Sequence, residues 1–231
     1  MSNALLLLPP YTPLSAQIQP WEDSVEEGQP TKQVQRVLSM PTLALYDVLQ
    51  SFQDIHRIVI NLAGELNDEQ LRWKPEGYST SIGFHLWHLA RESDYLKATL
   101  LQHYSALDPE FGDRTQIWQR EGLAQKWGFP PGLYETVGTG LSDETAALLP
   151  IPKKEELLSY LHASYKAIES FVELLDTKYA NFNGMSEDLR NQVQMIRLNL
   201  IVFLTHDCRH LGMMECLKGL QTGFGSATEK R

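Results

Sequence analysis

Apolar residues recur at intervals of three and four positions along most of the chain, which is the spacing of one face of an α-helix. The pattern predicts four long helices, at about 41–64, 81–103, 153–178 and 187–218. Ser81 and the hydroxyl residues before it offer N-cap oxygens for the second helix. No stretch shows a convincing strand alternation of apolar and polar residues. The sequence therefore predicts an all-α fold, a four-helix bundle with one long crossover.

The long crossover, between the second and third helices, spans about 104–153 and is punctuated by glycine and proline. One helical piece, at about 113–127, is predicted within it. A connection of this length in a compact domain is usually functional, for example as a lid or a pocket wall. We therefore expect it to lie near the functional site.

The chain ends are expected to differ from the bundle, which should span 39–220. Residues 1–38 hold several prolines and acidic residues, and predict an N-terminal arm that is partly disordered or docked. If the arm docks, Leu5–Leu8 and Trp21 would contact the bundle or a second subunit. Residues 221–231 are expected to form a flexible tail.

The composition limits the possible partners. The chain has 231 residues, 42% of them apolar, and a formal net charge of -9. An acidic surface repels phosphate backbones, which argues against nucleic acid as a general partner. No stretch reaches the ~20 apolar residues of a membrane span, and the apolar run Ala4–Leu8 is too short for an export signal.

The two cysteines, Cys208 and Cys216, both fall on the last predicted helix. Helical rise separates their Cα atoms by ~12 Å, beyond the ~7 Å that a disulfide allows. We interpret them as reduced packing cysteines. Reduced thiols in turn predict a cytoplasmic protein.

Two histidines on the last helix carry the main chemical signal. In the run THDCRHLG, His206 and His210 lie one turn apart and point within ~40° of each other. Their face also carries Asn199 and residues expected in the core, namely Val202, Phe203, Met213, Met214 and Leu217. A buried polar pair needs partners, and a shared metal ion would supply one. Ordinary hydrogen bonds, in the core or at the surface, are the alternative.

A third histidine on the second helix strengthens the metal interpretation. The run SIGFHLWHLARESDY supplies His88, which would face the other pair across the bundle core. Catalytic divalent sites commonly use three protein ligands and keep a position open for water or substrate. The predicted ligands are therefore His88, His206 and His210. His85 lies about 60° round the helix from His88, and is expected in the pocket or, as the alternative, as a ligand.

Polar residues near these histidines are candidates for proton transfer and for lining the pocket. Glu92 lies one turn beyond His88 on nearly the same face, where it could orient a ligand or act as a general base. The alternative for Glu92 is a solvated surface carboxylate. Tyr95 shares this face and is a second catalytic candidate. Asn199, on the face of His206, is expected to line the pocket.

Other candidates are weaker. His56, His103 and His162 stand alone and are interpreted as surface residues. The run Gly138-Thr139-Gly140 is not a phosphate loop, because no strand precedes it and no Gly-Lys-Ser/Thr follows. Core or pocket-wall positions are expected for Trp87, Trp118 and Trp127.

Two runs resemble the DinB/YfiT-like family. LNDEQLRWKPEGYSTSIGFHLWHLARESDYL is similar to the family's first half, and LTHDCRHLGMMECLKGL to its H-x-x-x-H-x-G close. Between them, IWQREGLAQKWGFPPG resembles the loop of a subgroup with a long insert. The resemblance covers about 40–220 and implies the family's helix bundle. It also implies that the family's metal histidines are His88, His206 and His210.

The resemblance further implies a metalloenzyme. Relatives in the superfamily include transferases and isomerases that use low-molecular-weight thiols, and an iron-binding domain of sulfoxide synthases. We therefore expect metal-dependent S-transferase-type or hydrolytic chemistry on a small-molecule substrate. Zinc is the first expectation and nickel or iron the alternatives, because imidazole suits all three. A non-catalytic metal-binding stress-response protein is the alternative function. The relatives also imply a homodimer.

Overall fold

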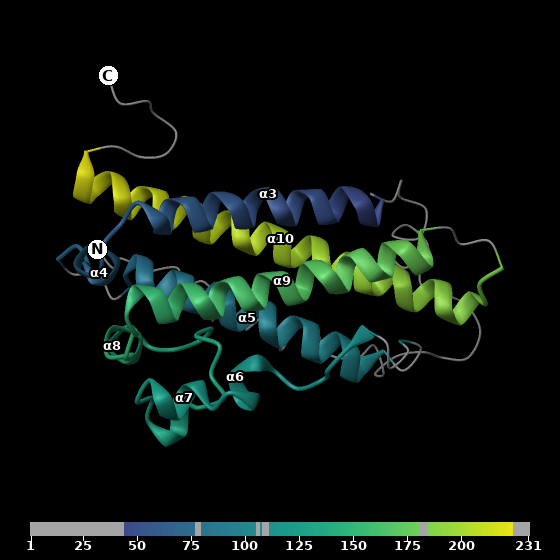
Figure 1. The fold of residues 1–231 in the computed structure, drawn as a ribbon, viewed down its shortest axis with the longest axis horizontal. Helices are drawn as coiled ribbons and strands as arrows, with labels where there is room; N and C mark the ends of the chain where they lie inside the picture. The colour runs from purple at the N-terminus through teal and green to yellow at the C-terminus, as the bar shows by residue number, and fades with distance from the viewer. Residues whose placement is uncertain (1–43, 77–79, 105–106, 108–110, 181–183, 224–231) are drawn as a thin grey trace, which may run out of the picture.

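The computed structural model describes residues 44–76, 80–104, 107, 111–180 and 184–223, and within them all regular structure is helical (Figure 1). The predicted arm over 1–38 and most of the predicted tail lie outside these residues. Four long helices run beside one another, which confirms the predicted all-α bundle. They are α3 (Leu45–Gly64), α5 (Ile82–His103), α9 (Lys154–Tyr179) and α10 (Glu187–Thr222).

Capping side chains explain where several helices begin and end. Ser81 caps α5 by accepting a hydrogen bond from the backbone N–H of Phe84 at 3.2 Å. Asn67 and Gln70 cap the short α4 (Asp68–Arg72) reciprocally. The sequence predicts an end at residue 218 for the last helix, but α10 continues to Thr222 and ends at Gly223, with φ +76°. Its last turn is held against α4, because the Gln221 amide donates to the Gln70 carbonyl at 3.1 Å.

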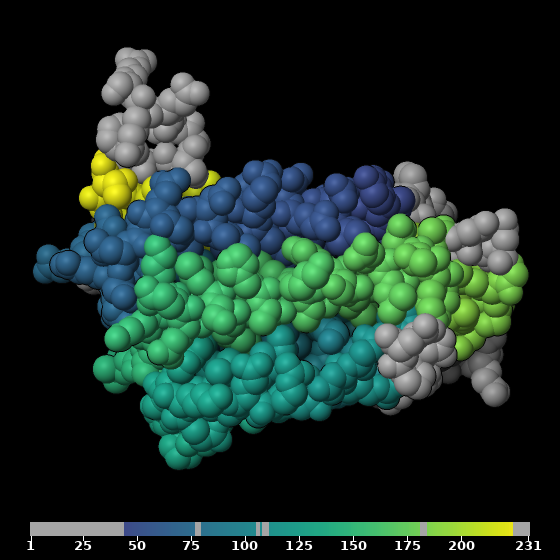
Figure 2. Space-filling view, viewed as in Figure 1, coloured from purple at the N-terminus to yellow at the C-terminus, as the bar shows by residue number. Residues whose placement is uncertain are grey.

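The four long helices pack in a ring around two groups of buried apolar side chains. α9 contacts α3 and α5, and α10 contacts the same two helices. One apolar group surrounds Trp87 and Met214, and the other surrounds Phe52 and Phe171. In the face drawn in Figure 2, α9 lies across the middle, between α3 and the segment that joins α5 to α9.

The outer face of α10 is more apolar than predicted. Phe203, Met214 and Leu217 are buried as expected, but Val202 is 46% exposed and Met213 is 42% exposed, so their predicted core positions are wrong. The cause is that α10 packs on α3 and α5 only along its inner face. Even so, no helix within the described ranges is both long and apolar enough to cross a membrane.

The connection between α5 and α9 packs beside these two helices and contains several short elements (Figure 1). The predicted single helix at 113–127 is in fact two, α6 (Ile117–Arg120) and α7 (Leu123–Lys126). They are separated at Gly122, whose φ of +62° is left-handed and ends a right-handed helix. A 3₁₀ turn, η3 (Pro131–Leu133), and α8 (Asp143–Ala147) follow.

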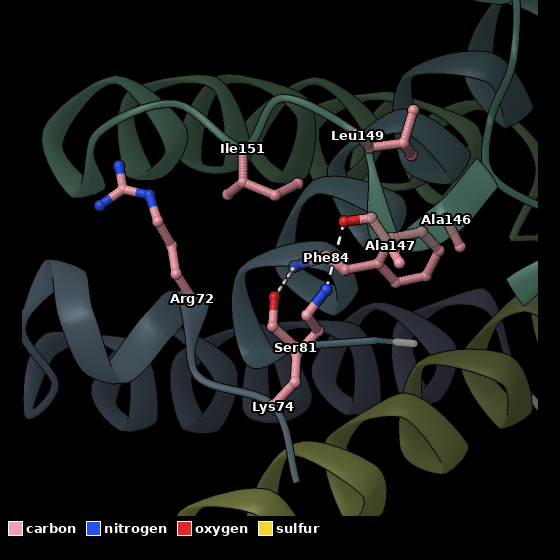
Figure 3. Close-up of a pocket in the computed structure, with 8 residues that line it drawn as sticks. All are labelled: Arg72, Lys74, Ser81, Phe84, Ala146, Ala147, Leu149 and Ile151. Atoms are coloured by element: carbon pink, nitrogen blue, oxygen red, sulfur yellow. Dashed lines mark hydrogen bonds between the residues drawn. The ribbon is translucent and has the colours of Figure 1, made fainter. Parts of the chain in front are cut away.

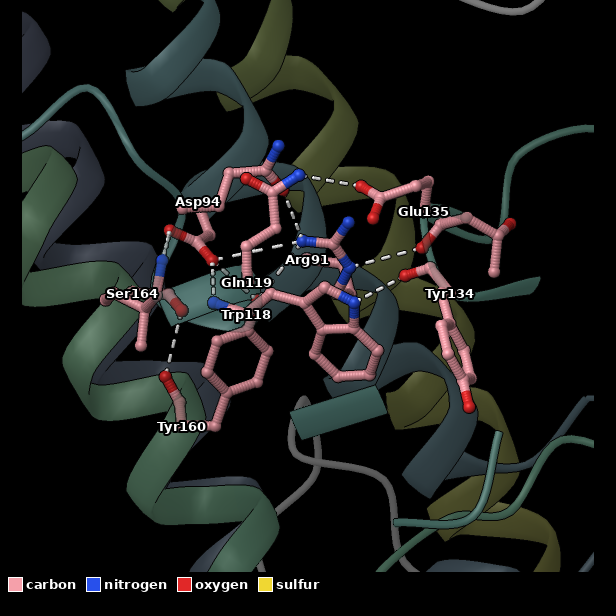
Figure 4. Close-up of polar contacts among 11 residues, drawn as sticks. Arg91, Asp94, Trp118, Gln119, Tyr134, Glu135, Tyr160 and Ser164 are labelled. Atoms are coloured by element: carbon pink, nitrogen blue, oxygen red, sulfur yellow. Dashed lines mark hydrogen bonds and ion pairs between the residues drawn. The ribbon is translucent and has the colours of Figure 1, made fainter. Parts of the chain in front are cut away.

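A buried carboxylate on α5 fastens this connection to the bundle (Figure 4). The two oxygens of Asp94 accept hydrogen bonds from the backbone N–H groups of Ile117 and Trp118, each at 2.9 Å. Asp94 also accepts a hydrogen bond from the Tyr160 hydroxyl on α9 at 3.0 Å. Asp94 therefore ties the start of α6 to two long helices.

A buried guanidinium completes this network. Arg91, fully buried on α5, donates to the Thr136 carbonyl at 3.1 Å and to the Gln116 side chain at 2.7 Å. It also lies over the Trp118 ring, 4.7 Å from the ring centroid. Together, Arg91 and Asp94 hold both ends of the segment from Gln116 to Thr136 against α5.

Replacing Asp94 by alanine should lower the free energy of unfolding by ~3–5 kcal/mol, because three buried donors lose their acceptor and the buried Arg91 charge loses the carboxylate with which it pairs at 3.9 Å. Urea denaturation measures the change. Asp54→Ala is the control, since Asp54 makes only an exposed ion pair with Arg57 at 3.0 Å and should cost less than ~1 kcal/mol. Equal losses from both changes would show that the buried hydrogen bonds of Asp94 stabilise the fold no more than an exposed ion pair does.

Candidate metal centre

Three histidine side chains converge inside the bundle, His88 from α5 and His206 and His210 from α10. One ring nitrogen of each lies within 4.8 Å of the others, and no other three His, Cys, Asp or Glu side chains among the described residues come as close. The Nε2 atoms of His88 and His206 are 3.1 Å apart. The rings of His206 and His210 lie 4.4 Å apart between centroids. The structure thus brings together the three residues predicted as ligands.

Burial favours the neutral form of His88, His210 and the adjacent His85. Burial and the neighbouring His206 lower the pKa of His88 to about 3 and that of His85 to about 4. Burial and the adjacent histidines also lower the pKa of His210. A neutral imidazole keeps the lone pair that binds a metal ion. The cluster is therefore ready to bind a cation at neutral pH.

One hydrogen bond determines which nitrogen of His88 faces the cluster. His88 Nδ1 donates to the carbonyl oxygen of Val137 at 2.5 Å. Because a carbonyl only accepts, the proton lies on Nδ1 and the lone pair on Nε2. Nε2 is also the atom that faces His206. This orientation is typical of histidines that bind metals.

His85 lies beside the three histidines and outside their group. It is 4% exposed, and its Nδ1 is 2.9 Å from Nδ1 of His210. One of these two nitrogens must donate and the other accept, so the contact orients the His210 ring. That position fits the pocket residue expected from the sequence. Its role stays a prediction.

The connection between α5 and α9 forms one wall of the site at Val137–Thr139. The Thr139 hydroxyl donates to Glu92 Oε1 at 2.8 Å, while Val137 accepts from His88. Gly138, between them, has φ +103°, and a Cβ at that position would lie 2.9 Å from His88 Nδ1. Such a contact is closer than van der Waals packing permits, so only glycine fits here. The sequence predicts no such role for Gly138, because a glycine run that fails as a phosphate loop does not otherwise reveal a close approach to a histidine.

Glu92 is enclosed at the site. It is 6% exposed, so the alternative of a solvated surface carboxylate is wrong. Burial raises the pKa of Glu92, and the hydrogen bond from Thr139 opposes that rise. A carboxyl group with a raised pKa is better matched to proton transfer near neutral pH. The catalytic role of Glu92 stays a prediction.

Tyr95 and Asn199 have weaker connections to the three histidines. Tyr95 is half-buried on α5, one turn after Glu92. Asn199 lies two turns before His206, and its amide donates to the Met195 carbonyl at 2.9 Å and to the Tyr104 hydroxyl at 3.5 Å. These bonds draw the Asn199 amide toward its own helix and α5. The predicted roles of both residues stay predictions.

Three residues outside the predicted site differ from expectation. His56, interpreted as a surface residue, is 1% exposed and stacks on the Tyr165 ring with centroids 3.5 Å apart. That interpretation is wrong, because the residue lies on the inner face of α3. Cys208 and Cys216 are free thiols, as predicted, but both are exposed, so the packing role assigned to them is wrong.

A separate pocket of about 150 Å³ lies beside the start of α5 (Figure 3). The two cationic side chains that line it both hydrogen-bond to the backbone. Lys74 donates to the Ala147 carbonyl at 3.2 Å, and Arg72 donates to the Pro152 carbonyl at 2.9 Å. Phe84 lines it and also lies against His88, with ring centroids 6.0 Å apart. The pocket therefore adjoins the histidine cluster through Phe84, and its third polar side chain, Ser81, is engaged in capping α5.

Comparison with known proteins identifies a family for the chain. A family model described as DinB superfamily matches residues 52–214, more than half of the chain, and that stretch contains all three histidines. No curated protein matches the chain.

The metal-free protein should lose stability as the pH falls below about 6.5. Below that value the unfolded chain binds protons at His85, His88 and His210, whereas the folded chain does not until the pH approaches about 4 for His85 and about 3 for His88. Each such histidine contributes up to ~1.4 kcal/mol per pH unit. Urea denaturation at pH 6.5, 5.5 and 4.5 measures the slope. His88→Asn should flatten it, while the exposed His162→Asn should leave it unchanged; equal slopes in all three proteins would refute this.

Replacing Gly138 by alanine should lower the free energy of unfolding by ~2–3 kcal/mol, because the new methyl group meets His88 and Trp87 at 2.9 Å. Gly140→Ala is a matched control, since Gly140 also has a positive φ of +79° but nothing within 4 Å of its Cβ position. The control isolates backbone strain, so the difference between the two variants reports the close approach to His88. Equal losses of unfolding free energy from the two variants would mean that the connection does not pack closely against His88.

Proposed function

The chain belongs to the DinB superfamily, and we propose that it is a metal-dependent enzyme whose divalent ion is held by His88, His206 and His210. The observation that carries the proposal is the convergence of three imidazoles, two buried and His210 half-buried, with one ring nitrogen of each within 4.8 Å of the others. Burial that favours the neutral rings of His88 and His210, and a hydrogen bond that directs Nε2 of His88 into the cluster, support it.

The donor set fits a divalent transition metal. The 3.1 Å between the Nε2 atoms of His88 and His206 is close to the ~3.3 Å expected for two nitrogens on one tetrahedral ion. Imidazole suits zinc, nickel and iron alike, and zinc is the ion we favour. Among the described residues the cluster consists of three histidines without a carboxylate, which disfavours magnesium and calcium because these ions prefer oxygen ligands.

We propose that the site activates a thiol or a water molecule. When bound, an ion held by three neutral imidazoles would lower the pKa of either group at its remaining position. Glu92 would take the released proton, held in place by the Thr139 hydroxyl. In the transferase form, the sulfur of a low-molecular-weight thiol then bonds to an electrophilic carbon of the second substrate, and the leaving group on that carbon departs with the bonding electrons and takes the proton from Glu92. In the hydrolytic form, the oxygen of water bonds to the carbon of the scissile bond, and the leaving group again takes the electrons of the broken bond and the proton.

The main alternative is a non-catalytic protein in which the ion is structural. Structural zinc sites are normally closed by four protein ligands. Here the described residues supply a group of three, and this open arrangement favours the enzyme. The expected homodimer stays a prediction.

The wild-type chain should bind one zinc ion, and His206→Ala should abolish that binding because two imidazoles form a poor site. Metal analysis after dialysis gives the stoichiometry. His85→Ala should keep its ion, and His162→Ala, an exposed histidine on α9, is the matched control. Equal metal loss from His85→Ala and His206→Ala would make His85 a ligand, and retention by His206→Ala would overturn the site.

A small thiol should bind the cobalt-loaded protein and produce an intense charge-transfer band, because an anionic ligand is attracted to an ion with three neutral ligands. Absorption spectroscopy with and without the thiol measures this. The metal-free protein with the same thiol is the control. If the spectrum does not change and no electrophile is consumed, the transferase form is excluded, and hydrolysis or a non-catalytic role takes its place.

A further inference from the structure

A second group of polar side chains, three of them buried and one half-buried, lies behind His206, where three helices meet. It consists of His56 on α3, Tyr165 and Glu169 on α9, and Asp207 on α10. His56 is 1% exposed, and Tyr165 and Asp207 are each 2% exposed. His56 Nδ1 lies 2.6 Å from Glu169 Oε1 and hydrogen-bonds to it. The group is therefore anchored at one end and reaches His206 at the other.

Asp207 stands between two imidazoles in this group. Its Oδ2 faces His56 Nε2 at 3.6 Å, and its Oδ1 faces His206 Nδ1 at 3.7 Å. Both distances are slightly longer than a hydrogen bond. His56 Nε2, His206 Nδ1 and Asp207 Oδ2 are also buried without a hydrogen-bond partner. Buried polar atoms without partners are rare in native proteins, and a small rotation of the Asp207 carboxylate would bring these atoms toward one another.

The charges around His56 favour a position of the Asp207 carboxylate between His56 and His206. Burial lowers the pKa of His56, but hydrogen bonding and the negative charges of Asp207 and Glu169 outweigh burial and raise that pKa above its ordinary value. A protonated His56 attracts the Asp207 carboxylate and holds it in place. Tyr165 covers the flat face of the His56 ring. An ionised carboxylate can only accept hydrogen bonds.

We propose that Asp207 is the positioning residue for His206, held in place by His56 and Glu169. By accepting from Nδ1–H of His206, the carboxylate keeps the lone pair on Nε2, the atom that faces His88. The inference rests on the proposed metal site and adds to it the residues that orient its second ligand. His88 is oriented by a backbone carbonyl, whereas His206 is oriented by a side-chain relay across three helices.

The proposal predicts that Asp207→Asn weakens metal binding by changing the tautomer of His206. An asparagine of the same shape can donate to Nδ1 of His206, which moves the ring proton to Nε2 and blocks that nitrogen as a ligand. Loss of such an orienting partner typically weakens metal binding ~10–100-fold. Asp207→Glu keeps an acceptor and should recover most of the affinity. Asp188→Asn is the matched control, since Asp188 lies exposed in the first turn of the same helix.

The experiment measures zinc affinity of the full chain by competition with a chromophoric chelator, together with the histidine ring nitrogen shifts by NMR of the zinc-loaded protein. Wild type and Asp188→Asn should bind equally and show His206 bound through Nε2. Asp207→Asn should bind ~10–100-fold more weakly and lose that signature. His56→Gln should bind several-fold more weakly, and the double variant no more weakly than Asp207→Asn alone.

The outcomes separate the two proposals. If the wild-type chain binds no zinc, the metal site itself fails, and the inference fails with it. If the wild type binds zinc and Asp207→Asn binds equally with His206 unchanged, only the positioning role is overturned. Additive losses from His56→Gln and Asp207→Asn would overturn the shared relay. Circular dichroism checks folding; if Asp207→Asn does not fold, the pair Asp207→Glu and Asp207→Gln makes the same comparison.

Discussion

The hydrogen bond from His88 to the Val137 carbonyl joins the two parts of the molecule on which the site depends. It determines the tautomer of a buried histidine and also sets the position of the connection on α5. Neighbouring residues of α5 repeat the arrangement, since Arg91 bonds to Thr136 and Glu92 to Thr139. Three contacts close together therefore fix the position of the connection along α5, and Gly138 makes the close approach possible.

The bundle supplies what such a site requires. Burying polar groups is costly unless they find partners, and the histidines find theirs across α5, α10 and the connection. On one side of His206 lie uncharged imidazoles suited to a cation. On its other side, at Nδ1, lie Asp207, His56 and Glu169, which form a charged group. α10 contributes to both sides because consecutive residues on a helix point ~100° apart.

Much of this arrangement could be predicted from the sequence. The apolar spacing was sufficient for four long helices, and the one-turn spacing of His206 and His210 was sufficient to place both on the inner face of α10. The location of His88 opposite them was predicted from the three-ligand pattern of open metal sites and supported by the resemblance, because periodicity alone does not say which helices meet. The break at Gly122 was missed because a left-handed glycine is not distinguishable by composition from one inside a helix.

Long-range contacts were the least predictable part. Nothing in the sequence near His56 signals that Glu169, 113 positions away, will bond to it. An isolated histidine looks the same in sequence whether its helix face is covered or not, and the surface assignment failed for that reason. The opposite error was made on α10, where Val202, Met213 and the two cysteines were predicted to be buried but are exposed. Apolar residues on a helix do not reveal which of its faces is covered.

X-ray absorption at the metal edge of the zinc-loaded wild-type chain tests the central claim most directly. The account predicts a spectrum dominated by three imidazole nitrogens at ~2.0–2.1 Å, with one further light atom at the remaining position. A shell of sulfur ligands from Cys208 or Cys216, or a shell of oxygens without the imidazole scattering pattern, would contradict the assignment of His88, His206 and His210.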